Sequence, residues 1–254
     1  MLAVATLAVA GFALLKPIAP PPVPDSIARY TPAPQPTVEP APTVSQAADL
    51  LEANPDKEWT LAVLGDSTGN EAGEWVDLVA RDLGARYDRP VIMHFWDDKA
   101  LAYQAPQQVV SGSHAAINVW DGSAPGRSAD YSREKLNDLL PVKADLLIIN
   151  HGHNHQTPSA AVASIRSLIF TAGLRHGPTA TAVTIQNPWQ QPTASSNGVQ
   201  DAIRKSFTGS EFPVIDVMGA FKSAPNVAAL MKDNIHPNPA GSRVWADVVL
   251  SSAF

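Results

Sequence analysis

Short apolar runs alternate with helical patterns along the chain from Trp59 to the C-terminus. Six apolar runs, each bounded by polar or turn-forming residues, have the length of buried strands and cover residues 60–65, 91–95, 115–120, 145–150, 180–186 and 213–217. The helical patterns lie between and after them, at residues 74–83, 132–140, 158–172, 198–207 and 239–252. Continuously apolar strands that alternate with helices are typical of a parallel sheet covered on both faces. We therefore expect an α/β fold, a three-layer α/β/α sandwich around a mostly parallel sheet of five or six strands.

The chain before Trp59 follows a different pattern. Residues 2–15 are a continuous apolar run, which has the length of a signal-peptide core and is short for a bilayer span. Residues 17–43 are rich in proline, and such a composition favours extended polyproline II and cannot bury a core. We expect residues 1–16 to be a signal peptide or membrane anchor, residues 17–58 a Pro-rich linker and residues 59–254 a globular domain. The protein is then exported, and is either extracellular or attached to the cell envelope through residues 2–15.

Composition narrows the classes of function. Apolar residues make up 45% of the chain, which is enough to fill the core of a folded domain. The formal net charge is -6 and no run of Lys or Arg occurs, so nucleic acid is not an expected partner. Cysteine is absent, which excludes thiol nucleophiles and Cys-ligated zinc.

Polar, turn-forming residues directly follow two of the expected strands. They occupy residues 65–69, which contain Ser67, and residues 150–155. Ligands of open parallel sheets bind beyond the carboxyl ends of the strands, so these residues are candidates for chemistry. Asp233 and His236 stand close together just before the last helix. A serine hydroxyl needs an adjacent base to become a nucleophile, and a carboxylate can orient that base.

These segments resemble four sequence blocks of the SGNH, or GDSL, hydrolase family of esterases and acylhydrolases, and the resemblance covers nearly all of residues 59–254. The blocks occur here in the family's order: Gly65-Asp66-Ser67, Gly126 within residues 125–129, Gly152-His153-Asn154, and Asp233-Asn234-Ile235-His236. The resemblance implies a flavodoxin-like sheet. Two positions depart from the family's common residues, because Thr68 stands in place of leucine and His155 in place of aspartate.

The resemblance also implies a role for each residue. Ser67 is the nucleophile, His236 is its base, and Asp233 orients His236. The oxyanion hole consists of the backbone amides of Ser67 and Gly126 and the side-chain amide of Asn154. Gly122, which also follows a strand, is a second candidate for the oxyanion glycine. No metal or organic cofactor is expected.

The expected activity is a serine ester hydrolase that removes short, acetyl-like groups from a carbohydrate or a small ester. The residues 126–129 resemble those of carbohydrate acetylesterases in the family, and the expected catalytic loops lack a long apolar stretch to house a lipid. His153, His155 and Trp189 are candidates for substrate contact. The alternatives are an acyltransferase or a lipid acylhydrolase on the same fold, or a non-catalytic glycan-binding module with Trp96, Trp120 and Trp189 near strand ends.

Other interpretations of the same residues remain open. Residues 65–69 also satisfy Gly-x-Ser-x-Gly, the nucleophile elbow of α/β-hydrolases, although that elbow normally comes after several strands. Ser67 could instead cap a helix. His151, His153 and His155 alternate, as imidazole ligands of a metal would on one side of an extended segment, but no fourth ligand is evident.

Overall fold

The computed structural model of the chain describes residues 40–193, 196 and 198–254. The expected signal peptide or anchor, residues 1–16, and residues 17–39 of the expected linker lie outside these described residues. Within the described part of the chain, no helix is both long enough and apolar enough to cross a membrane.

Six parallel strands form the centre of the sheet, in the order β2-β5-β1-β6-β7-β8. Each overlaps one of the six expected apolar runs: β1 (Trp59–Gly65), β2 (Val91–Asp97), β5 (Ile117–Asp121), β6 (Leu146–Asn150), β7 (Ala180–Ile185) and β8 (Val214–Asp216). Two short strands that we did not expect pair antiparallel with β2, namely β3 (Ala102–Tyr103) and β4 (Gln107–Val110). The expected three-layer α/β sandwich with a mostly parallel sheet is confirmed.

The order of the strands predicts where on the sheet a ligand binds. Without β2, the remaining parallel strands β5-β1-β6-β7-β8 have the flavodoxin order. Strand β2 therefore extends this parallel part of the sheet by one strand beyond β5. The chain leaves β1 towards β2 and β5 and then crosses to β6 on the other side of β1. The carboxyl ends of β1 and β6 therefore meet at a topological switch point, where ligands of such sheets bind.

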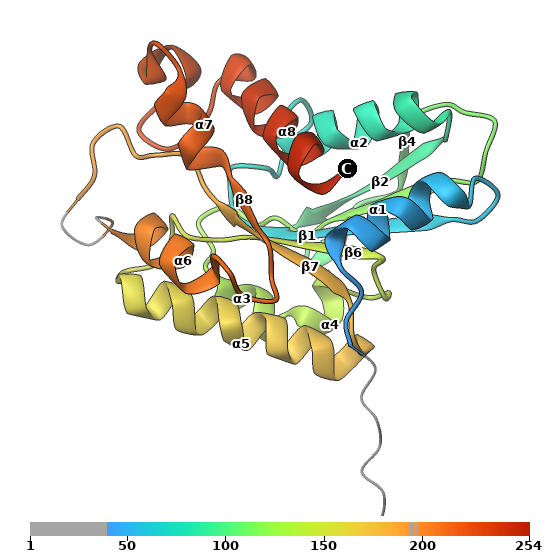
Figure 1. The fold of residues 1–254 in the computed structure, drawn as a ribbon, viewed down its shortest axis with the longest axis horizontal. Helices are drawn as coiled ribbons and strands as arrows, with labels where there is room; N and C mark the ends of the chain where they lie inside the picture. Colours follow the sequence, from blue (N-terminus) through green and yellow to red (C-terminus); the bar gives the residue numbers. More distant parts are fainter. Residues whose placement is uncertain (1–39, 194–195, 197) are drawn as a thin grey trace, which may run out of the picture. The chain divides into compact units, whose positions relative to one another are not determined.

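Two layers of helices cover the sheet (Figure 1). One layer packs with the cluster of buried side chains around Leu61 and Trp245, and consists of α1 (Val44–Ala53), α2 (Trp75–Tyr87), α7 (Val217–Ser223) and α8 (Pro239–Ala253). The other packs with the cluster around Leu64 and Ile165, and consists of α3 (Ala129–Glu134), α4 (Leu136–Leu139), α5 (Pro158–His176) and α6 (Val199–Phe207). A 3₁₀ helix, η2 (Val227–Leu230), precedes the His236 loop.

The expectation that the linker extends to residue 58 is wrong, because α1 belongs to the globular part. Val44, Ala47 and Leu51 are buried in the core cluster that contains Trp245. Thr43 and Gln46 form a capping box at the start of α1. Apolar side chains at i, i+3 and i+7 are a helical pattern, which the adjacent proline-rich composition obscured.

The helix expected over residues 132–140 is also different. It is divided at Lys135 into α3 and α4, and α3 begins earlier than expected, at Ala129. The unexpected α7 follows β8 without a loop, because the Asp216 side chain ends the strand by accepting a hydrogen bond from the Gly219 amide.

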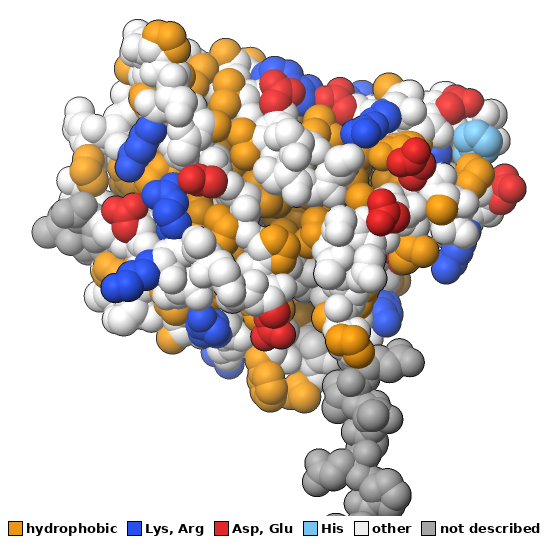
Figure 2. Space-filling model, viewed as in Figure 1, with side chains coloured by type: hydrophobic (Ala, Val, Ile, Leu, Met, Phe, Trp, Pro, Cys, Tyr) orange, Lys and Arg blue, Asp and Glu red, His pale blue; other side chains and the backbone are white. Residues whose placement is uncertain are grey.

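Acidic and basic side chains are interspersed on the face shown in Figure 2, which presents no extended patch of one sign. Mixed surface charge of this kind offers no track for a phosphate backbone.

Candidate active site

Ser67 stands at the apex of a turn that follows β1. The buried Asp66 fixes this turn, because its Oδ1 accepts hydrogen bonds from the Thr68 amide at 3.2 Å and from the Thr68 hydroxyl at 2.8 Å. Ser67 itself is half-buried between these two buried neighbours. The turn therefore directs the Ser67 hydroxyl away from the core and towards the loop before α8.

The structure brings Ser67, His236 and Asp233 together, although 169 positions of the sequence separate Ser67 from His236. Ser67 Oγ lies 2.8 Å from His236 Nε2, and His236 Nδ1 lies 2.8 Å from Asp233 Oδ2. A proton on Nδ1 is held by the Asp233 carboxylate, which leaves Nε2 free to accept the hydroxyl proton of Ser67. This is the geometry of a Ser-His-Asp triad.

Asp233 is held in its ionised form. Partial burial alone would raise its pKa, but hydrogen bonds from the backbone amides of His236 and Ile235 and from the His236 ring outweigh that effect, and the pKa falls to about 2. Both amides donate to Asp233 Oδ1, at 2.8 and 2.9 Å. The short Asp-x-x-His loop thus folds around its own carboxylate, which then faces the imidazole as a fixed negative charge.

Gly126 occupies a turn in the loop between β5 and α3. The Arg127 amide donates to the Ala124 carbonyl at 3.2 Å, with Pro125 and Gly126 in the two central positions. Gly126 has a φ of 70°, and a turn with proline first and a left-handed residue second favours glycine. Among the described residues, no acceptor is paired with the Gly126 amide, which remains available to a ligand.

The alternative oxyanion glycine, Gly122, does not have a free amide. Its N–H donates to the Val63 carbonyl at 2.8 Å, and the residue is buried. A Cβ at this position would lie 3.0 Å from the Leu64 side chain, so packing explains the glycine. Gly126 is the better candidate of the two.

Asn154 lies beside Gly126. Its side-chain Nδ2 donates to the Arg127 carbonyl at 3.1 Å, which links the loop after β6 to the Gly126 turn. Asn154 is half-buried, whereas its neighbours His153 and His155 are buried. Two of the three donors expected at the oxyanion hole, the Gly126 amide and the Asn154 side chain, therefore belong to loops that are in contact in the structure.

Thr68, one of the two departures from the family's common residues, has polar partners below the turn. Its hydroxyl donates to Asp66 and accepts from Asn150 Nδ2 at 3.1 Å. Asn150 ends β6, so the threonine joins the carboxyl ends of the two central strands. A leucine could not make either hydrogen bond.

The three alternating histidines do not converge on one point. His151 Nε2 pairs with the Ser132 hydroxyl at 2.9 Å, and His153 Nε2 pairs with the Asn187 carbonyl at 2.9 Å. The His155 ring packs edge-on against that of His151, with centroids 6.4 Å apart. Within the described part of the chain, no group of three His, Asp or Glu side chains is placed to hold a metal ion.

Burial changes the interpretation of the candidate substrate contacts. His153 and His155 are only 4% and 7% exposed, and burial lowers the pKa of both. They are therefore neutral interior groups with little surface left for a substrate. Trp189 is half-buried and packs edge-on against His153 at a centroid distance of 5.3 Å. Of the three candidates, Trp189 has the most surface left for a ligand.

Two carboxyl groups near the triad were not expected from the sequence. Burial raises the pKa of Glu74 to about 7, and His236 is among the charges that act on it. Burial also raises the pKa of Asp121, at the end of β5, to about 7, with Glu74 a further cause. Asp121 stands directly after the expected strand 115–120. The expectation that functional residues directly follow parallel strands, which identified Ser67, therefore also applies to Asp121.

The sequence analysis also missed the segment after β7. Gln186 and Asn187 are fully buried at the strand's end, and the Gln186 side chain bonds both Asp66 and the Asn154 loop. The position could have been found from the sequence, because Gln186 ends the expected strand 180–186 and Asn187 directly follows it, but their partners on other strands could not.

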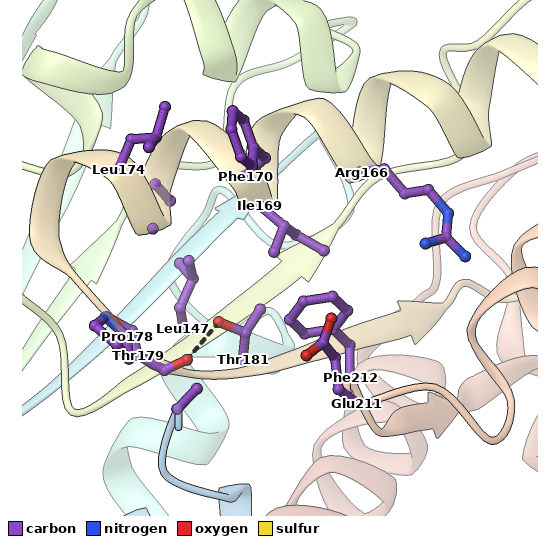
Figure 3. Close-up of a pocket in the computed structure, with 13 residues that line it drawn as sticks. Leu147, Arg166, Ile169, Phe170, Leu174, Pro178, Thr179, Thr181, Glu211 and Phe212 are labelled. Atoms are coloured by element: carbon purple, nitrogen blue, oxygen red, sulfur yellow. Dashed lines mark hydrogen bonds between the residues drawn. The ribbon is translucent and has the colours of Figure 1, made fainter. Parts of the chain in front are cut away.

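A cavity of about 340 Å³ lies elsewhere in the molecule (Figure 3). It opens between α5 and the segments before β7 and β8, with Ile169, Phe170 and Phe212 in its wall. None of the proposed catalytic residues lines it. Its volume is not evidence about the size of the substrate.

The α/β-hydrolase elbow is not the arrangement seen here. That motif places the nucleophile on a sharp turn between a strand and the helix that follows it. Here β1 ends at Gly65 and α2 begins only at Trp75, and β1 is the first strand of the sheet. The serine turn is therefore of the type expected from the SGNH resemblance.

No family model matches this sequence, and no curated protein matches it by sequence. Solved structures do match. A carbohydrate esterase of family 3 from Talaromyces cellulolyticus is 19% identical, with a TM-score of 0.55 over 75% of this chain and 94% of that one. A lipase/acylhydrolase from Enterococcus faecalis is 19% identical, with a TM-score of 0.54 over 76% and 94% of the two chains.

A two-domain esterase active on acetylated mannans is 14% identical, with a TM-score of 0.58 over 82% of this chain. The match spans only 51% of that esterase, about half its length. A protein of the G-D-S-L family from Desulfitobacterium hafniense is also similar in structure, with a TM-score of 0.55 at 13% identity. These similarities show that the chain has the fold of SGNH, or GDSL-like, hydrolases.

Proposed function

We propose that the protein is a serine ester hydrolase in which Ser67, His236 and Asp233 are the catalytic triad. The observation that carries the proposal is the continuous hydrogen-bonded chain from the Ser67 hydroxyl through both ring nitrogens of His236 to Asp233. The fold shared with esterases and acylhydrolases supports the same reaction class.

The reaction proceeds in two steps. His236 Nε2 takes the proton of Ser67 Oγ as the oxygen attacks the ester carbonyl, and the same proton then passes to the departing alcohol. Water next attacks the acyl-enzyme, gives a proton to His236, and releases the acid and the free Ser67 hydroxyl. The amides of Ser67 and Gly126 and the side chain of Asn154 stabilise the tetrahedral oxyanion in both steps. No step requires a metal or an organic cofactor.

We assign the substrate to short acyl esters, such as acetyl groups on a carbohydrate. Two structural neighbours support this assignment, since one is an esterase active on acetylated mannans and another is a carbohydrate esterase of family 3. A polysaccharide substrate agrees with an exported enzyme that is carried on a Pro-rich segment. Hydrolysis of lipid esters is the second candidate, favoured by the similarity to a lipase/acylhydrolase.

A chain-length series tests both parts of the proposal. We expect nitrophenyl acetate to be hydrolysed with a higher kcat/KM than nitrophenyl octanoate, and acetate to be released from an acetylated polysaccharide. Ser67→Ala should abolish the activity while the circular dichroism spectrum is unchanged, and a phosphonate should label Ser67 alone. A preference for the long chain would indicate a lipid acylhydrolase, and full activity of Ser67→Ala would contradict the mechanism.

A further inference from the structure

The post-β7 segment, residues 186–191, lies against three of the loops that carry proposed triad or oxyanion residues. It directly follows β7, which pairs with β6, and β6 pairs with β1. The loops in question are the Ser67 turn after β1, residues 150–155 after β6, and residues 233–236 before α8. A single segment that contacts all of them can fix their spacing.

Gln186 is the residue at which the first two loops meet. Its Nε2 donates to Asp66 Oδ2 at 2.9 Å, directly below the Ser67 turn. Its Oε1 accepts the backbone N–H of His153 at 2.8 Å, directly before Asn154. The side chain is fully buried, so these hydrogen bonds are shielded from water.

The amide, in this orientation, satisfies both partners at once. The Asp66 carboxylate requires a donor, whereas the His153 N–H requires an acceptor, and the Gln186 side chain supplies one of each. The two groups are adjacent on one side chain, so the nucleophile turn and the Asn154 loop are connected through a single rigid amide.

The Gln186 side chain is itself held in place. Gln200 on α6 accepts the Gln186 backbone N–H at 2.9 Å and donates to Gln186 Oε1 at 3.3 Å. Gly152 provides the space, because a Cβ there would lie 2.7 Å from Gln186 Oε1. Any other rotamer of this amide would lose hydrogen bonds to Asp66, His153 or Gln200.

The far end of the post-β7 segment holds the triad loop. Gln190 Nε2 donates to the Asp233 carbonyl at 2.6 Å, and the Gln191 amide donates to Asn234 Oδ1 at 2.6 Å. Asn187 Nδ2 donates to the Ile235 carbonyl at 2.9 Å. These bonds hold the loop from Asp233 to Ile235, directly before His236.

We propose that Gln186 is a positioning residue for the ester hydrolysis proposed above, on which this inference rests. It holds the Ser67 turn and the Asn154 loop at the spacing that the transition state requires, while the remainder of the post-β7 segment holds His236 and Asp233. Gln186 touches neither the substrate nor the reacting atoms.

The first test compares Gln186→Met with Thr181→Val. Methionine keeps the volume of the side chain but removes its donor and its acceptor. We expect kcat per active site, counted by phosphonate titration, to fall roughly tenfold or more with KM nearly unchanged, since the lost interactions align groups for the transition state. Thr181 is a matched control, because its hydroxyl bonds the Thr179 carbonyl at the opposite end of β7 (Figure 3), and its variant should keep the wild-type kcat.

The second test uses the pH profile of Gln186→Glu. Two carboxyl groups at hydrogen-bond distance share one proton, and the shared pair then has one donor and a free acceptor, as the amide does. We expect kcat of this variant to approach the wild-type value at acidic pH and to fall relative to wild type as the pH rises and the shared proton is lost. A change that only lowered stability would not follow this titration.

The outcomes separate this proposal from the proposed function. If the wild type hydrolyses esters while Gln186→Met retains the wild-type kcat per titrated site, the positioning role is wrong. If Gln186→Met does not fold, the decision rests on Gln186→Glu. The positioning role is then wrong if the kcat of Gln186→Glu, divided by the wild-type kcat, does not change with pH. If the wild type hydrolyses no ester, the proposed function is wrong, and the positioning role of Gln186, which rests on it, is wrong as well.

Discussion

At the scale of single residues, the neighbourhood of His236 determines the pH dependence of the reaction. His236 must be neutral to accept the Ser67 proton, so kcat/KM should rise with pH. Burial raises the pKa of the nearby Glu74 to about 7, and the positive charge of a protonated His236 counteracts this by attracting the carboxylate. We predict that Glu74→Gln moves the rising limb of the pH profile to lower pH, measured as kcat/KM on a short-chain ester.

A limb that does not move in Glu74→Gln would show that this carboxyl is not coupled to the reaction. Glu52→Gln is the matched control, because Glu52 is an exposed carboxylate of α1 that is not among the groups acting on Glu74.

Asn154 provides the second test at this scale. If its amide binds the oxyanion, it acts mainly on charge that develops in the transition state. Asn154→Ala should therefore lower kcat by roughly a hundredfold and change KM little, as steady-state kinetics can show. An increase in KM with kcat preserved would make Asn154 a substrate-positioning residue.

The buried Asp121 carboxyl, at the end of β5, makes the free energy of unfolding depend on pH. The pKa of this fully buried carboxyl is raised to about 7 by burial, whereas an aspartate in the unfolded chain ionises near its ordinary value of 3.8. The unfolded chain thus loses the proton first, so the contribution of Asp121 to stability is greatest at acidic pH, decreases as the pH rises towards about 7, and is constant above that. The difference of roughly three pH units corresponds to at most about 4 kcal/mol.

We predict that Asp121→Asn is more stable than wild type at neutral pH, and that its advantage in urea unfolding disappears at about pH 3 and below, where the carboxyl is protonated in both states. A constant difference between the two proteins across this range would show that Asp121 ionises normally in the folded state.

At the scale of elements, the sequence predicts those parts whose pattern is local. Each of the six parallel strands was visible, because a strand buried on both faces is a continuous apolar run. The short edge strands β3 and β4 were not, since half-exposed strands of two and four residues have no such run. The triad was predicted from the motif after β1 and the Asp-x-x-His motif before α8, with roles implied by the family resemblance, whereas the Gln186 network depends on side-chain contacts across β1, β6 and β7 that no local pattern encodes.

The start of α8 holds the His236 loop, and Asn238 is its key residue. The Asn238 side chain accepts from the Ala240 and Gly241 amides as a helix cap, while its Nδ2 donates to the Ala229 carbonyl at 2.8 Å. We predict that Asn238→Ala lowers the free energy of unfolding by about 1 kcal/mol or more, because both the cap and the link to η2 are lost.

The variant Asn238→Asp separates the two contributions. Aspartate retains the cap acceptor but not the donor to Ala229, so its stability should lie between that of the wild type and that of Asn238→Ala. If the two variants are equally destabilised in urea unfolding, the link to η2 and not the cap determines the effect.

At the scale of the whole molecule, the globular part begins before the sheet. The buried Arg89 joins α1 to the rest of the fold, since its guanidinium donates to the carbonyls of Leu51 at 3.1 Å and Ala115 at 2.6 Å. A charge this deeply buried needs its hydrogen-bond partners, and several of them lie in residues 51–57. Residues 40–58 are therefore part of the folding unit.

The last prediction tests this boundary with two adjacent leucines of α1. Leu51 is 1% exposed and lies in the core, whereas Leu50 is 50% exposed on the same helix. Leu51→Ala should lower the free energy of unfolding by about 2–5 kcal/mol, the usual cost of emptying a core site, while Leu50→Ala should change it by only a few tenths. A chain shortened to begin at residue 40 should unfold at the same urea concentration as the full chain, and one that begins at residue 59 should be strongly destabilised. Equal stability of these two shortened chains would mean that α1 contributes nothing to the fold and that the sequence-based boundary at Trp59 was right.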